Sequence, residues 1–199
     1  NIGKPYTTEA LHMKEDSVAV AEMSSFQLET IHAFRPCVSA ILNITPDHLN
    51  RHHTMENYIQ AKKGIAKNQT EEDTCVLNFE DEVTRKFGGN LKAKVLYFSS
   101  QRKLEKGIYL EDGNIIYKVD EPTLICHVSE LKLLGTHNYE NVMAAAAMAA
   151  AYGVPMDIIR KTVKEFAGKR FAKFNDRVHI EFDMRSESEI GYVRCLGGL

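Results

Sequence analysis

Two short segments place residues that bind metal ions or transfer protons directly after runs typical of buried strands. Glu22 ends the apolar run 18–22 and is followed by Ser24 and Ser25, and His48 closes the segment that follows the run 37–43. Open α/β sheets bind their ligands at the carboxyl ends of parallel strands. The spacing therefore predicts ligand chemistry at two strand ends, although a strand-end carboxylate such as Glu22, taken alone, is more often a solvated surface residue.

Three closely spaced histidines, His48, His52 and His53, raise the alternative of a zinc site. The helical metalloprotease pattern requires glutamate at position 49, where this chain has leucine. The chain also has no Cys-x-x-Cys pair of the kind that structural zinc sites use. The histidine spacing therefore gives zinc little support.

Lys62 lies four residues after Tyr58, near the apolar face of a helix predicted over 54–68. Helical lysines are usually solvated, as we expect for Lys63 and Lys67. Burial would lower the pKa of Lys62 and expose a neutral, nucleophilic amine. Lys62 is therefore a candidate functional residue if its side chain is buried.

Helices and strands must bring these residues together. Strands predicted at 18–22 and 37–43 flank a helix within 24–34, which makes a βαβ unit. Thr54 is the expected N-cap of the helix that carries Lys62. Further strands are predicted at 74–78 and 95–99, with a helix at 80–87 between them. The fold class is therefore α/β, with a mostly parallel, doubly wound sheet.

The second half of the chain adds a small antiparallel β patch and two helices. Asp112-Gly113 separates two strand-like runs within 107–119, which is a strong signal for a tight hairpin. An alanine-rich helix is predicted from 138 to 152, ended by Gly153, and Pro155 starts another that runs to about 166. The small side chains of the first helix allow close approach to a sheet or a nucleotide.

Composition excludes several classes of protein. The 199 residues carry 25 basic and 27 acidic side chains, a formal charge of −2, and 44% are hydrophobic, which is typical of a globular domain. Without a basic patch, nucleic acid is not an expected partner. The longest apolar stretch, 142–154, is shorter than the roughly 20 residues that span a membrane, so no membrane insertion is expected. Four scattered cysteines favour reduced core residues and a cytoplasmic location.

Five sequence strings, taken in order over about residues 1–168, resemble the Mur ligases, the ATP-dependent enzymes that build the peptide of the bacterial wall precursor. The similarity is greatest to the member that adds D-glutamate to UDP-N-acetylmuramoyl-L-alanine. The strings are Asn1-Ile2-Gly3, Glu22-Met23-Ser24-Ser25-Phe26-Gln27-Leu28-Glu29, Leu42-Asn43-Ile44-Thr45-Pro46-Asp47-His48-Leu49, Tyr58-Ile59-Gln60-Ala61-Lys62 and Gly135-Thr136-His137-Asn138-Tyr139-Glu140-Asn141.

The resemblance implies a role for each matching residue. Glu22 and His48 would bind Mg²⁺, and Lys62 would carry a CO₂-derived carbamate beside the metal, with Lys62 and His48 as catalytic residues. The implied contacts of the UDP-sugar substrate are Asn1, Ser24 and Ser25, and those of ATP are His137, Asn138 and Asn141. In the family reaction the substrate carboxylate attacks the γ-phosphate to give an acyl phosphate. The amine of D-glutamate then displaces phosphate.

Departures from the family pattern set further expectations. Neither Gly-x-x-x-x-Gly-Lys-Ser/Thr nor Gly-x-Gly-x-x-Gly occurs in the chain. The family's phosphate loop and first strand are expected before Asn1, so we expect an open sheet edge beside the neighbouring strands. Asn50 stands where the family usually has aspartate. We expect residues 1–168 to form the middle domain, incomplete at its start, and residues 169–199 to be a divergent tail at the start of the C-terminal ligase domain.

The resemblance leaves alternatives open. By itself the chain is expected not to catalyse ligation, because the phosphate loop and the flanking domains contribute to the family's site. Another Mur ligase or a folylpolyglutamate-type ligase, with a different acceptor or amino acid, is a second hypothesis. A non-catalytic remnant that binds nucleotide or metal is a third.

Overall fold

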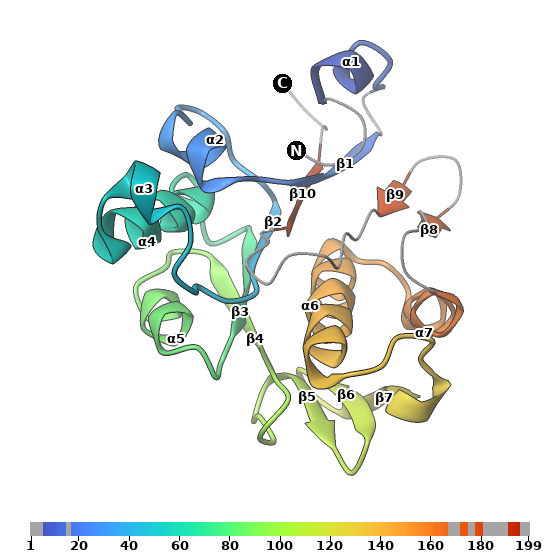
Figure 1. Ribbon diagram of the computed structural model, residues 1–199. Coiled ribbons are helices and arrows are strands. Elements are labelled where there is room, and N and C mark those ends of the chain that lie inside the picture. The colour runs from blue at the N-terminus through green and yellow to red at the C-terminus, as the bar shows by residue number, and fades with distance from the viewer. Residues whose placement is uncertain (1–5, 15–16, 167–171, 175–177, 181–190, 196–199) are drawn as a thin grey trace.

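The computed structural model describes residues 6–14, 17–166, 172–174, 178–180 and 191–195 (Figure 1). Its described helices are α1 (Tyr6–Ala10), α2 (Ser25–Glu29), α3 (Leu49–His52), α4 (Met55–Lys63), α5 (Glu82–Gly88), α6 (Thr136–Tyr152) and α7 (Met156–Glu165), with 3₁₀ turns at η1 (Gly64–Ala66) and η2 (Val128–Glu130). Not one of them has both the length and the apolar character needed to cross a lipid bilayer.

The described strands form one ten-stranded sheet in the order β7-β6-β5-β4-β3-β2-β10-β1-β9-β8. They are β1 (Val18–Glu22), β2 (Val38–Ile41), β3 (Thr74–Asn78), β4 (Lys94–Ser99), β5 (Gly107–Glu111), β6 (Asn114–Lys118), β7 (Pro122–His127), β8 (Ala172–Phe174), β9 (Val178–Ile180) and β10 (Gly191–Cys195). Strands β2 to β5 are parallel, and β5, β6 and β7 form the antiparallel patch. The predicted α/β class is confirmed.

Strand β10 occupies the position between β1 and β2. It pairs antiparallel with both neighbours, Val193 lying opposite Val20 in β1 and Val38 in β2. The expectation of an open edge beside these two strands is therefore wrong, because their backbone hydrogen bonds are made to β10. The predicted βαβ unit also has this strand inserted between its two members.

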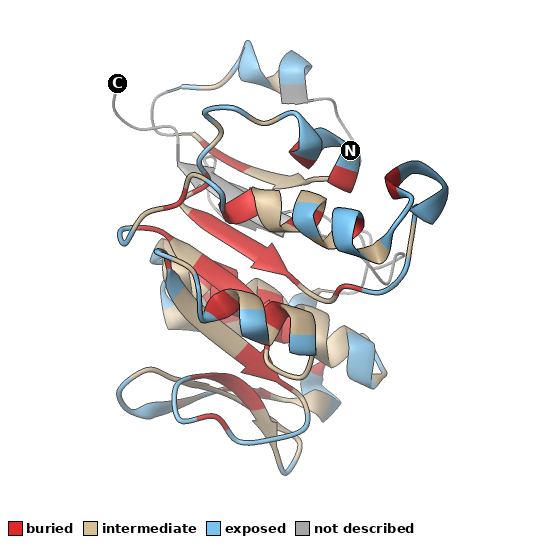
Figure 2. Cartoon of the chain, turned by 90° about the vertical axis from the view of Figure 1, so that its left-hand side faces the viewer, coloured by how far each residue is buried: buried red, intermediate tan, exposed pale blue. Residues whose placement is uncertain are grey.

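Side chains alternate between two cores, one on each face of the sheet. Val38, Val76 and Phe98 point into a core with α6, whereas Ile41 and Leu77 pack with residues of α2 and α4 on the other face. The buried strands lie between layers of partly exposed helices (Figure 2). Alanines 144, 146 and 147 are buried, so the small side chains of α6 do permit close packing on the sheet.

Local signals define several elements well. Thr54 caps α4, with its hydroxyl accepting from the Asn57 N–H at 3.2 Å. Asp112 and Gly113 both have positive φ, 49° and 75°, as a tight hairpin turn requires. Gly153 ends α6 in the left-handed conformation at φ 93°. Helix α2 is shorter than predicted, since it stops at Glu29 and the chain bends before Arg35-Pro36.

Cys75 and Cys126 are buried free thiols, as predicted, and Cys37 is half-buried. Burial raises the pKa of Cys75 to about 12, and burial together with the nearby Glu130 raises that of Cys126 to about 11. These two thiols therefore remain protonated at neutral pH and serve as core side chains.

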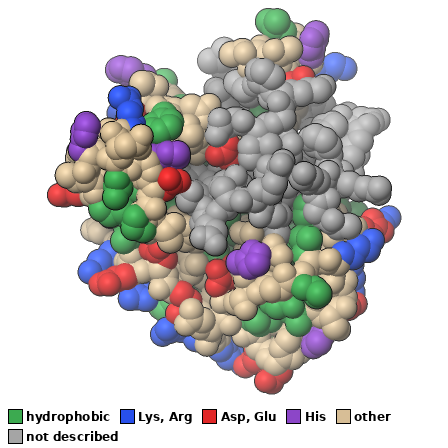
Figure 3. All heavy atoms as spheres, in the orientation of Figure 1, with side chains coloured by type: hydrophobic (Ala, Val, Ile, Leu, Met, Phe, Trp, Pro, Cys, Tyr) green, Lys and Arg blue, Asp and Glu red, His purple; other side chains and the backbone are tan. Residues whose placement is uncertain are grey.

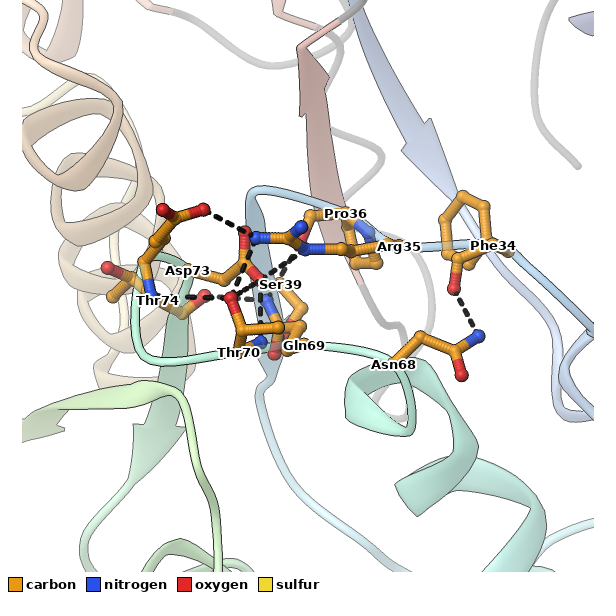
Figure 4. Close-up of polar contacts among 10 residues, drawn as sticks. Phe34, Arg35, Pro36, Ser39, Asn68, Gln69, Thr70, Asp73 and Thr74 are labelled. Carbon is orange, nitrogen blue, oxygen red and sulfur yellow. Dashed lines mark hydrogen bonds and ion pairs between the residues drawn. The ribbon is translucent and has the colours of Figure 1, made fainter. Parts of the chain in front are cut away.

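A polar network joins the segments that lead into β2 and β3 (Figure 4). Arg35 Nε donates to Asp73 Oδ2 at 2.7 Å, and its Nη2 donates to Thr70 and Glu72. Hydrogen bonds to Asp73 and Glu72 raise the pKa of the guanidinium further. The buried Gln69 amide donates to the carbonyls of Pro36 and Thr74 and accepts from the Ser39 hydroxyl. This network lies at the amino ends of the strands.

Candidate active site at the carboxyl ends of the strands

The turn after β1 is fixed by side chains of α2. Glu22 is the last residue of β1, and Ser24 caps α2 through a box in which Gln27 Oε1 accepts from the Ser24 N–H at 2.9 Å. Ser25 is only 3% exposed, and its hydroxyl lies 2.9 Å from His52 Nε2. Both hydroxyls predicted to contact substrate are therefore engaged within the protein.

The loop after β2 carries His48 in a left-handed backbone conformation, with φ 50°. The His48 N–H donates to Asp47 Oδ1 at 2.7 Å, and His48 Nε2 lies 3.3 Å from Asp47 Oδ2. At the start of the loop, the Ile44 N–H donates to Asp81 Oδ2 at 2.9 Å, while Asp81 Oδ1 caps α5. Asp81 therefore links the loop that holds His48 to the loop after β3.

Lys62 is buried, as hypothesised, with 4% of its surface exposed. Its Nζ lies 5.2 Å from the centre of the Tyr58 ring, whose electron-rich face attracts a cation. Lys63, one residue along, is only half-buried and contacts Phe87 instead. Of these two neighbouring lysines, the one predicted to be functional is the one enclosed by the protein.

A chain of ring contacts brings these three segments together. The Phe26 ring lies 4.9 Å from the His48 ring and stacks at 5.5 Å on His52, which lies 5.3 Å from Tyr58. Phe26 is the second residue of α2, the helix that follows Glu22, and Tyr58 contacts Lys62. Histidine side chains gather with hydrophobic and acidic ones over α2 and α3 on the face drawn in Figure 3. The segments of Glu22, His48 and Lys62 thus meet in one region.

Oxygen atoms suited to a hard cation lie at the ends of β1 and β2. Asn43 Oδ1, two residues after β2, is buried and makes no hydrogen bond within the described residues. Mg²⁺ prefers such carbonyl oxygens and carboxylates, so this atom and Glu22 fit the implied metal. No three His, Cys, Asp or Glu side chains in the described ranges form a complete metal-binding group by themselves.

The structure does not support zinc at the histidine cluster. His52 is 4% exposed, and its two ring nitrogens lie within hydrogen-bonding distance of Ser25 and Glu29. A zinc ion would need one of these nitrogens. His52 is therefore a residue that connects α2 to α3, a role that its spacing from His48 did not reveal.

The residues predicted to contact ATP lie in the first turns of α6. Asn138 Nδ2 donates to the Leu134 carbonyl at 2.7 Å, and Asn141 is half-buried one turn later. The Glu140 carboxylate accepts from Ser100, which directly follows β4. This contact places the start of α6 at the carboxyl end of β4, the edge where α/β sheets bind ligands. Asn1 lies outside the described residues.

Sequence reasoning missed three residues that shape the site: Phe26, Asp81 and His52 as a connecting residue. The Phe26 ring contacts both His48 and His52. Asp81 holds the loop of His48 by accepting from the N–H of Ile44, which is 37 positions away in the sequence. The only signal for Asp81 was its place three residues after the strand 74–78. The partner of Asp81 is a backbone N–H, and because every residue except proline has one, the sequence does not indicate this contact.

The fold and this arrangement of side chains define a doubly wound α/β domain with a candidate ligand site at the carboxyl ends of its strands. The family model of the Mur ligase middle domain matches residues 1–149, and the chain belongs to that family. Crystal structure II of MurF from Acinetobacter baumannii has a similar fold, with a TM-score of 0.54 and 21% identity, over 70% of this chain and 32% of that one.

Curated relatives narrow the comparison. The UDP-N-acetylmuramoylalanine–D-glutamate ligase of Lachnoclostridium phytofermentans is 60% identical over 169 residues, which are 84% of this chain and 37% of that enzyme. The ligase of the same name from Clostridioides difficile is 48% identical over 168 residues, again 84% of this chain and 37% of the relative. The chain thus spans little more than a third of the length of these relatives.

Proposed function

We propose that this chain is the ATP- and metal-handling middle domain of a ligase that adds D-glutamate to UDP-N-acetylmuramoyl-L-alanine. The relatives that carry the name of that activity are up to 60% identical over about four-fifths of the chain. The observation that carries the proposal is the burial of Lys62 at a cluster of rings that also contacts His48 and includes the turn after Glu22.

Mg²⁺ would be held by Glu22 and His48, with the buried oxygen of Asn43 as a further ligand. A bound Mg²⁺ would neutralise charge on phosphate oxygens during phosphoryl transfer. The buried amine of Lys62 would react with CO₂ in its neutral form and release a proton. The resulting carbamate would replace the lysine cation with an anionic group. It would supply an oxygen ligand to a site where the described acidic and histidine side chains do not form a complete metal-binding group by themselves.

The remaining site residues divide between the two larger substrates. His137, Asn138 and Asn141 would contact ATP from the first turns of α6. Ser24, Ser25 and Asn1 would contact the UDP-sugar. Because the Ser25 hydroxyl is buried against His52, its contribution would be to shape the turn. Residues 1–168 would form this domain, with residues 169–199 at the start of a C-terminal ligase domain. The free buried thiols favour a cytoplasmic enzyme.

An exchange of domains tests this proposal. Residues 1–168 replace the matching segment of the Lachnoclostridium phytofermentans relative, and phosphate release from ATP is measured with the UDP-sugar and a panel of amino acids. We expect release that requires D-glutamate. Lys62→Ala is expected to lower the rate about 100-fold through loss of an electrostatic group, whereas the matched control Lys63→Ala stays within about twofold because its side chain is half-exposed.

Two results would contradict the proposal. A folded chimera that releases no phosphate under conditions where the unexchanged relative is active would contradict the assignment of this chain to that ligase. Equal rates for Lys62→Ala and Lys63→Ala in an active chimera would remove the proposed role of the buried amine.

A further inference from the structure

His52 is a buried, fully engaged imidazole at the centre of the site. It ends α3, a helix of four residues between His48 and His53, both of which have positive φ. Such backbone costs of order 1 kcal/mol or more at residues other than glycine, and it persists where surrounding contacts hold it in place. The contacts of the His52 ring, together with the hydrogen bond from Arg51 to Glu29, tie this segment to α2.

Both ring nitrogens of His52 meet side chains of α2. Nδ1 lies 3.1 Å from Glu29 Oε1, and Nε2 lies 2.9 Å from the Ser25 hydroxyl. The second oxygen of Glu29 accepts from Arg51 at 2.9 Å. A carboxylate only accepts hydrogen bonds, so a hydrogen bond at this 3.1 Å contact requires the proton to be on Nδ1. In the neutral ring, Nε2 then accepts from the Ser25 hydroxyl.

Two aromatic rings that also contact the rest of the site pack against the same imidazole. Phe26, which also contacts His48, stacks on the ring with an interplanar angle of 14°. Tyr58, which contacts Lys62, packs against it at 5.3 Å. The orientation of one imidazole therefore depends on contacts that link it to the turn after β1, to the loop of His48 and to the helix of Lys62.

We propose that His52 is a positioning residue that couples the Ser24-Ser25 turn to the helix carrying Lys62, with its ring fixed as the Nδ1–H tautomer. In the ligase reaction proposed above, this coupling would align the UDP-sugar turn with the anionic group on Lys62. That consequence rests on the proposed function, whereas the coupling itself belongs to the protein without substrate. Ser25, 3% exposed, is too enclosed to act as a nucleophile on a substrate.

Nuclear magnetic resonance on the full 199-residue chain, without substrate, tests the coupling. Ring nitrogen shifts of ¹⁵N-histidine report the tautomer, with the His52 signal assigned from its loss in His52→Phe. The ¹³Cε signal of Lys62, assigned from its loss in Lys62→Arg, reports the surroundings of Lys62 on the coupled helix. We expect the Nδ1–H tautomer. Glu29→Gln should weaken this preference, because the new amide can either accept from or donate to Nδ1, and it should shift the Lys62 signal.

Two further variants keep this test decisive. Glu82→Gln, which breaks an exposed ion pair with Lys86 on α5, should change neither signal. Ser25→Ala should keep the tautomer, since Glu29 still accepts, and should shift the Lys62 signal; it replaces Glu29→Gln if that variant does not fold. The Nε2–H tautomer in the unmodified chain, or a Lys62 signal that is the same in both α2 variants, would overturn the proposal. Failure of the exchanged ligase would leave these results unaffected.

Discussion

Glu80 is a largely buried carboxylate that its neighbours hold at the carboxyl ends of the strands. Its side chain is 9% exposed, and it accepts from Arg102 Nη2 at 2.7 Å and from the Ser99 hydroxyl at 2.5 Å. Burial acts to raise the pKa of Glu80, but hydrogen bonds from Arg102 and Ser99, with the charges of Arg102 and Arg85, outweigh it and lower the pKa below 4.5.

This lowered pKa makes the contribution of Glu80 to stability depend on pH. A carboxylate with a lower pKa in the folded state stabilises the fold above its unfolded pKa, and this contribution is lost as pH falls through the folded pKa. We expect Glu80→Gln to lower the free energy of unfolding by about 1 kcal/mol at pH 7, and the difference to shrink toward pH 3. Urea unfolding at both pH values measures it; the same difference at pH 7 and pH 3 would contradict this.

At the residue scale, the sequence indicated the segments that meet in the candidate site better than it indicated the contacts that hold them together. The helical spacing from Tyr58 placed Lys62 near the apolar face, because residues four apart share a helix face, and Lys62 is buried. The partner of Ser25 is 27 positions away in the sequence, and nothing in the local pattern indicates it. Contacts of this kind depend on tertiary packing, which a pattern of residue types does not encode locally.

At the scale of elements, the hairpin of β5 and β6 depends on one glycine for two reasons. Gly113 has φ 75°, and a Cβ added there would lie 2.4 Å from His127 Nε2. The His127 ring cannot move freely, because its Nδ1 lies 2.7 Å from the Ser129 hydroxyl. Both the backbone conformation and the space therefore favour glycine.

Gly113→Ala is expected to destabilise the protein by about 2 kcal/mol, the sum of left-handed strain and the contact with His127. In a His127→Ala background the same substitution should cost less, because only the backbone strain remains. Thermal or urea unfolding of the four proteins measures the difference. An equal cost in both backgrounds would show that the imidazole contributes nothing.

Elements with local signals were predicted closely, and those set by distant pairing were not. The cap at Thr54, the turn at Asp112-Gly113 and the end of α6 at Gly153 were confirmed because each depends on neighbouring residues. The position of β10 was not predicted, since it pairs with strands about 150 or more residues earlier in the chain. Whether a segment forms a strand depends on local sequence, whereas the order of strands in the sheet depends on pairing between distant segments.

At the scale of the whole molecule, the two ends of the parallel strands carry different groups of side chains. The network of Arg35, Gln69 and Asp73 joins segments at the amino ends (Figure 4), whereas the candidate site lies at the carboxyl ends. No described residue of the first group is among the predicted site residues. Substitutions in the network at the amino ends should therefore lower stability without changing ligand binding at the carboxyl ends.

Gln69→Ala tests this separation. It leaves the Ser39 hydroxyl and the carbonyls of Pro36 and Thr74 without their buried partner, which should cost about 2–3 kcal/mol of unfolding free energy. Divalent metal binding to the folded protein should stay within about twofold. Asn90→Ala, which removes an exposed amide on the far side of α5, is the control. A large loss of metal affinity in folded Gln69→Ala would contradict the separation.

The central claim is that Glu22, His48 and Lys62 surround one divalent cation. Paramagnetic Mn²⁺, added below one equivalent to the labelled chain, broadens the signals of nuclei that lie near the bound ion. The account predicts selective broadening at Glu22, Asn43, His48 and the Lys62 side chain, and its loss in Glu22→Gln. Broadening centred elsewhere, with these four residues unaffected, would contradict it.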